Sequence, residues 1–149
     1  MLARLLAMTP FILFGVRAAA AASSFGADSI AVFQALNATR ASEHVPPVAL
    51  DTRLSDIAQR YAVEMALNNF FGHVSPEGLG PFARMSRAGY RYRYAGEDLA
   101  IDGSALTAAQ LLENDPAHRR VMANANFRRV GIGTAHSGQG IIIVEDFSD

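Results

Sequence analysis

The sequence contains no cysteine, no tryptophan and no lysine. Without cysteine the chain has no disulfide, no thiol nucleophile and no thiolate ligand, so any metal ligands must be histidine, aspartate or glutamate. Many small exported domains rely on disulfides, whereas this chain must be stable through its hydrophobic core alone. Half of the 149 residues are hydrophobic, which suits the core of one globular domain.

Positive charge is scarce and is carried by arginine alone. The formal net charge is −1, and it becomes about −3 when Arg4 and Arg17 of the N-terminal segment are left out. That balance argues against nucleic acid as the main partner. Tyr90–Tyr94 alternates tyrosine with arginine, as some nucleic-acid-binding surfaces do, but a strand with one buried face explains the pattern better.

Residues 1–22 are predicted to be a signal peptide. Arg4 supplies a positive start, residues 5–16 are apolar, and the alanines at 18–22 offer small-residue cleavage sites. The apolar stretch is shorter than the roughly 20 residues that span a bilayer. We expect an exported protein, secreted or periplasmic, with residues 23–28 as a flexible lead-in and residues 29–149 as a single domain. An uncleaved N-terminal anchor is the alternative, because Arg17 follows the apolar stretch.

The periodicity of apolar residues predicts a mixed fold. Helical spacing begins at Asp28 and is clearest after Asp51, a good N-cap. Asn37 and Arg40 lie on or near the apolar stripe of the first helix and are expected to make structural hydrogen bonds. Residues 141–144 are apolar on both faces, which is typical of a central strand. The pattern predicts about four helices and three or four strands in an α+β or layered α/β/α arrangement.

Three short segments, residues 71–78, 96–100 and 114–119, hold the candidate functional residues. They supply His73, Glu97, Asp115 and His118, each next to a turn or a helix end. Imidazole and carboxylate together can hold a divalent metal or polarise a water molecule. The start of a helix at Asp115 favours a neutral imidazole at His118, the form that binds a metal or accepts a proton.

Each of these residues also has an ordinary structural interpretation. A loop histidine such as His73 is more often a surface residue, Glu97 could pair with an arginine, and capping fully explains Asp115. Further acids, Glu113, Asp98 and Asp102, are predicted to be solvated. Ser75 and Ser86 have no feature that marks a nucleophile.

The same segments, in the same order, resemble the CAP superfamily, the SCP-like domain of bacterial secreted proteins. The resemblance rests on Asn37-Ala38-Thr39-Arg40, Phe70-Phe71-Gly72-His73-Val74-Ser75-Pro76-Glu77-Gly78, Gly96-Glu97-Asp98-Leu99-Ala100 and Asn114-Asp115-Pro116-Ala117-His118-Arg119. It runs from about Ile30 to Phe147, which is nearly the whole chain after the predicted signal peptide.

The resemblance implies a three-layer α-β-α sandwich with a small, mostly antiparallel sheet and a central cleft. In many members two histidines and two acids line the cleft and can bind zinc or another divalent ion. Here these positions are His73, His118, Glu97 and Asp115, with the two histidines as metal ligands. Asp115 departs from the serine or glutamate of other members, and Asp98 stands where asparagine is usual.

The resemblance leaves the activity open, because the scaffold serves several functions. We favour an exported binding module whose cleft holds a lipid, glycan or peptide at the cell envelope, since no nucleophile is evident. The alternative is a metal-dependent hydrolase, in which Glu97 acts as general base on a zinc-bound water and Asp115 is a ligand or an orienting group. A purely structural or interaction role is a third hypothesis. No nucleic acid partner and no membrane span after cleavage are expected.

Overall fold

The computed structural model describes residues 25–149, so the predicted signal peptide lies outside the described residues. The elements in chain order are α2 (Ala27–Ser42), β1 (Ala49–Leu50), α3 (Thr52–Asn68), α4 (Pro81–Arg87), β2 (Ala95–Asp102), α5 (Ala105–Asn114), α6 (Pro116–Met122), β3 (Arg129–Ser137) and β4 (Gly140–Ser148). Helix α2 begins within the stretch predicted as the lead-in. None of the helices in this part of the chain is long and apolar enough to cross a membrane.

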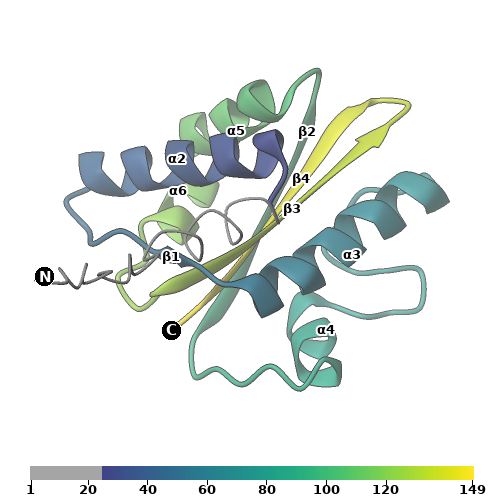
Figure 1. The fold of residues 1–149 in the computed structure, drawn as a ribbon, viewed down its shortest axis with the longest axis horizontal. Coiled ribbons are helices and arrows are strands. Elements are labelled where there is room, and N and C mark those ends of the chain that lie inside the picture. Colours follow the sequence, from purple (N-terminus) through teal and green to yellow (C-terminus); the bar gives the residue numbers. More distant parts are fainter. Residues whose placement is uncertain (1–24) are drawn as a thin grey trace, which may run out of the picture.

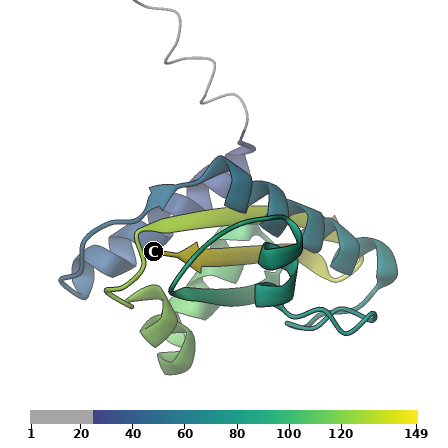
Figure 2. The same cartoon turned by 90° about the horizontal axis from the view of Figure 1, so that it is seen from below.

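The strands form one sheet in the order β1-β3-β4-β2. Strand β1 is parallel to β3, and the other neighbours are antiparallel. Helices α2, α5 and α6 cover one face, and α3 and α4 cover the other (Figure 1). The predicted three-layer α-β-α sandwich with a mostly antiparallel sheet is therefore confirmed. Figure 2 shows the layers from a second direction.

Helix α3 packs on the sheet at very short range because β3 presents glycine to it. The helix begins as predicted at Asp51, whose side chain accepts a hydrogen bond from the Leu54 amide at 2.9 Å. A Cβ atom at Gly133 would lie 2.3 Å from the carbonyl carbon of Ala58, and one at Gly131 would be equally close to Leu54. Backbone therefore meets backbone here, and no side chain larger than hydrogen fits between α3 and β3.

The other layer is fastened by the two polar residues of α2. Arg40 is fully buried, and its guanidinium donates hydrogen bonds to main-chain oxygens at positions 46, 122, 124 and 127. The side chain of Asn37 exchanges two hydrogen bonds with the main chain of Val48, at 2.9 and 3.1 Å. The prediction that both residues make structural hydrogen bonds is confirmed.

The prediction of a strand at Tyr90–Tyr94 is wrong. The segment is irregular, and β2 begins only at Ala95, which pairs with Ser148 near the end of β4. Within residues 25–149, no strand of the sheet pairs with the tyrosine–arginine segment. The alternation of burial is nevertheless real, since Tyr90 is buried while Arg91 and Arg93 are exposed.

Candidate functional site

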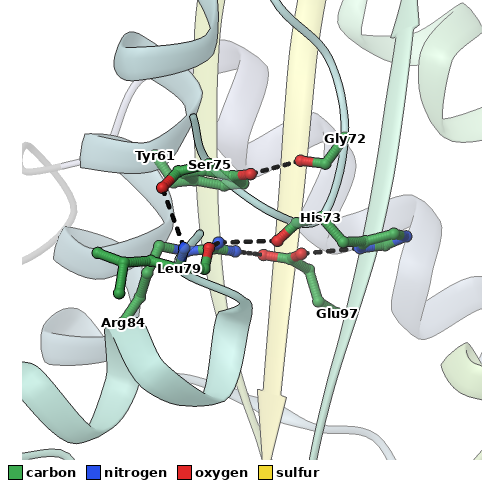
Figure 3. A network of polar contacts seen from close by, with 7 residues as sticks. All are labelled: Tyr61, Gly72, His73, Ser75, Leu79, Arg84 and Glu97. Carbon is green, nitrogen blue, oxygen red and sulfur yellow. Dashed lines mark hydrogen bonds and ion pairs between the residues drawn. The ribbon is translucent and has the colours of Figure 1, made fainter. Parts of the chain in front are cut away.

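The candidate site is a chain of three side chains from three elements on the α3–α4 face (Figure 3). His73 lies in the loop after α3, Arg84 lies on α4, and Glu97 lies on β2, an edge strand of the sheet. Nδ1 of His73 lies 2.8 Å from Oε1 of Glu97, and Nη2 of Arg84 contacts the other carboxylate oxygen. Both oxygens of Glu97 are thus engaged by a nitrogen.

The side chains of this site differ sharply in their exposure to solvent. The Glu97 side chain is 1% exposed, whereas the His73 side chain is 53% exposed. Because the buried carboxylate can only accept, we assign the proton of the neutral imidazole to Nδ1, which leaves Nε2 as an acceptor. When the ring is charged, Nε2 donates instead. The fold therefore holds an imidazole at the surface in a fixed orientation.

Arg84 also fixes the loop that carries His73. Its Nη1 donates to the main-chain oxygens of His73 and Leu79, both at 2.9 Å. Its guanidinium carbon lies 3.3 Å from the centre of the Tyr61 ring, and the Tyr61 hydroxyl donates to the main-chain oxygen of Gly72. Burial raises the pKa of Tyr61 to about 12, against the opposing influence of Arg84. Sequence reasoning missed Arg84, since a single arginine on a short helix carries no signal of its own.

A further buried acid, Asp146, adjoins these three side chains. Asp146 of β4 is paired in register with Glu97 and is fully buried, and within residues 25–149 neither of its carboxylate oxygens has a hydrogen-bond partner. Burial raises the pKa of Asp146 well above its ordinary value, and the neighbouring Glu97 raises it further, while Arg84 lowers it. Burial thus favours the protonated form of Asp146, while the carboxylate of Glu97 is paired with Arg84.

His118 and Asp115 form a second, separate pair at the start of α6. Oδ1 of Asp115 accepts from the amides of Ala117 and His118, at 2.8 and 3.0 Å, and lies 3.0 Å from Nδ1 of His118. The amide hydrogen bonds, with His118 first, lower the pKa of Asp115. Asp115 is thus a helix cap, as its ordinary interpretation predicted, and it also orients the imidazole of His118.

The structure brings the four predicted residues together as two pairs. Both histidines bond a carboxylate through Nδ1 and leave Nε2 free of carboxylate, as metal-binding histidines commonly do. The carboxylates face the histidines, and between residues 25 and 149 no three histidine, aspartate or glutamate side chains are placed to hold one ion. The described residues thus do not complete a metal site. Zinc or another divalent ion at His73 and His118 stays a prediction.

The prediction that Asp98 is solvated is wrong. Its side chain points to the opposite face of β2 from Glu97, beneath α5 and α6, and Asp98 is 1% exposed. It is paired in register with Glu145 of β4, which is fully buried as well. Burial raises the pKa of Asp98 to about 8, with further contributions from the charges of Glu97 and Asp115. The sequence analysis missed this burial because helices cover both faces of β2, which the sequence pattern does not reveal.

Comparison with known proteins identifies a matching family model and several relatives. Residues 33–147 match the family model described as CAP, cysteine-rich secretory protein family. The uncharacterized protein YkwD of Bacillus subtilis is 32% identical over 121 residues, which are 79% of this chain and 46% of that protein. The uncharacterized membrane protein YlbC of the same organism is 26% identical over 100 residues, 65% of this chain and 28% of that protein. The chain therefore spans less than half the length of these curated relatives.

Two of the solved structures that resemble this chain illustrate the shared fold. One is an extracellular protein containing an SCP domain from Bacillus anthracis, with a TM-score of 0.73 and 28% identity, covering 81% of this chain and 40% of that chain. The other is an outer surface protein of Borrelia burgdorferi, with a TM-score of 0.74 and 20% identity, covering 82% of this chain and 92% of that chain. At 20% identity the second likeness concerns the fold alone.

Proposed function

Since the chain belongs to the CAP, or cysteine-rich secretory protein, family, we propose that it is an exported binding module that holds a lipid, glycan or peptide of the cell envelope at His73. The observation that carries the proposal is an imidazole that is half exposed yet held by a buried carboxylate. An exported location is supported by the extracellular Bacillus anthracis neighbour and by the predicted signal peptide. The proposal concerns this domain, because the curated relatives are longer.

The surroundings of His73 suit a ligand that is partly apolar. Phe71 and Val74, on either side of it in the loop, are 46% and 58% exposed. Large apolar side chains held at the surface beside an oriented polar group are typical of binding sites, in which the polar group fixes the orientation of the ligand. The buried partners of His73 reduce the entropy lost on binding, because they already restrict the ring and its loop.

The surroundings of Glu97 and Ser75 do not favour the hydrolase alternative. A general base needs an oxygen that can reach water, but Glu97 is buried and each of its oxygens already contacts His73 or Arg84. Ser75 is also buried, and its hydroxyl donates to Glu77 at 3.1 Å instead of to a histidine. The group that the site offers to a ligand is the free edge of an imidazole, which can accept or donate one hydrogen bond.

The proposal is tested by calorimetric titration of the protein with three uncharged probes, one for each ligand class. These are a monoacylglycerol, an N-acetylglucosamine tetramer and a neutral tetrapeptide. Saturable binding of one probe that is lost in His73→Ala supports the proposal. The matched control is His136→Ala, because His136 is a histidine on β3 with a highly exposed side chain. Binding of none of the probes, or a cleaved product in place of a stable complex, would contradict it.

A further inference from the structure

A hollow lined by four arginines lies at the end of the sheet where β2 and β3 begin. Its volume is about 380 Å³, and the arginines are Arg91, Arg93, Arg128 and Arg129. They come from two segments far apart in the sequence. The register brings these segments together, because Ala95 and Arg129 both pair with Ser148 on opposite sides of β4. The tyrosine–arginine alternation that does not form a strand thus directs two arginines to this hollow.

Of the four arginines, only Arg93 forms an ion pair with an acid within residues 25–149. The acid in the lining is Asp149, whose Oδ1 accepts from the amides of Arg93 and Tyr94 at 2.7 and 3.0 Å. Nε of Arg93 lies 3.3 Å from Oδ2 of the same side chain. Among the ion pairs of the chain from residue 25 onward, none involves Arg91, Arg128 or Arg129. Arg129 donates a hydrogen bond to the main-chain oxygen of Asp149.

A further positive charge is buried close to the hollow. Arg40 binds only main-chain oxygens among the described residues, so no carboxylate balances it. Burial lowers the pKa of Arg40, and the positive charge of Arg128 lowers it further, so the two charges affect each other. A cation in a poorly polarisable interior strengthens the positive potential above it. These positive charges are clustered although the formal net charge of the whole sequence is −1.

We propose that this hollow binds a phosphate group, carried either by a lipid headgroup or by a soluble phosphate ester. Guanidinium groups donate paired hydrogen bonds that match phosphate oxygens, and several arginines suit a group with more than one negative charge. Tyr94 and Asn126, which also line the hollow, offer a hydroxyl and an amide to the remaining oxygens. An extended nucleic acid would need a longer basic surface than one hollow provides.

The test compares two double variants of the full chain. Arg91→Ala/Arg128→Ala removes two arginines of the hollow that make no ion pair in the described structure. Arg60→Ala/Arg87→Ala removes the same charge from exposed positions on α3 and α4. Each protein is titrated with glycerol 3-phosphate and is sedimented with phosphatidylglycerol vesicles, with phosphatidylcholine vesicles as the background. Loss of two charge-assisted contacts is expected to weaken binding at least about tenfold in the hollow variant only.

The two probes identify the source of the phosphate. Binding to phosphatidylglycerol vesicles alone assigns a lipid headgroup, and binding to glycerol 3-phosphate assigns a soluble ester. If neither probe binds above background, the proposal is wrong. An equal loss in Arg60→Ala/Arg87→Ala would also overturn it, because net charge and not the hollow would then explain the binding.

Discussion

Replacing Asp98 by asparagine is expected to stabilise the protein at neutral pH. Asp98 is buried beside the fully buried Glu145. Within the described chain, Oδ2 of Asp98 and both oxygens of Glu145 lack hydrogen-bond partners. Asparagine has nearly the same shape and no charge, and its amide can donate to the Glu145 carboxyl group. The substitution therefore removes a carboxyl group that must keep its proton in order to be buried, and it satisfies an acceptor.

The magnitude follows from the pKa of Asp98, which burial raises from 3.8 to about 8. Between these values the unfolded chain has released a proton that the folded protein still binds, so the free energy of unfolding falls as the pH rises. One pKa unit corresponds to about 1.4 kcal/mol, which gives an upper limit of about 4 kcal/mol between pH 4 and pH 7. Burying the amide costs about 1–2 kcal/mol of this. The expected net gain for Asp98→Asn is about 2 kcal/mol at pH 7 and none at pH 4.

The assay is thermal unfolding of the wild type and Asp98→Asn at pH 4, pH 5.5 and pH 7. For a domain of this size the gain corresponds to a Tm about 8 °C higher at pH 7, and the difference should shrink as the pH falls. Asp56→Asn, at an exposed position on α3, is the control for removing a carboxylate from the surface. A Tm shift of the same size at pH 4 would refute the reasoning, because at that pH the folded wild type and the folded variant both carry an uncharged side chain at position 98. So would a variant less stable than the wild type at pH 7.

Three further predictions concern the buried Arg84–Glu97 ion pair, the contact between Gly133 and α3, and the two histidines. Arg84→Ala leaves a buried carboxylate without its cation and is expected to cost about 3–5 kcal/mol in urea unfolding, and a loss below about 1 kcal/mol would contradict the ion pair. Gly133→Ala places a Cβ atom 2.3 Å from the backbone of α3 and should cost more than about 3 kcal/mol, whereas Gly138→Ala, which has open space, should change stability by less than about 0.5 kcal/mol. If the predicted metal binds, elemental analysis will find stoichiometric zinc in the wild type and none in His73→Ala/His118→Ala, and its absence from both would rule out the predicted ion.

The parts of the fold that the sequence predicted are those with a strong local signal. The spacing of apolar residues after Asp51 and the cap itself predicted α3, and the apolar run at residues 141–144 predicted a central strand. Asn37 and Arg40 were predicted as structural because they are polar residues within an apolar stripe. In each case the local sequence pattern and the tertiary packing agree, which is why reasoning from the chain alone succeeded.

The parts that were missed depend on what covers each residue in space. Tyr90–Tyr94 has the alternation of a strand, but the sheet offers it no neighbour. The burial of Asp98, Glu145 and Asp146 depends on helices packed over both faces of β2 and β4. The contact between Arg84 and Glu97 joins a short helix to an edge strand. Sequence periodicity indicates which side chains share a face, but not what lies above that face.

The buried guanidinium of Arg40 acts as a cross-link in a chain that has no cysteine. It joins the end of α2 to main-chain oxygens up to 87 residues away, which a disulfide could do in a protein folded under oxidising conditions. Hydrogen bonds to carbonyl groups need no oxidant, no isomerase and no choice among alternative pairings. The domain should therefore fold equally well under reducing and oxidising conditions. A thiol reductant should leave its unfolding midpoint unchanged.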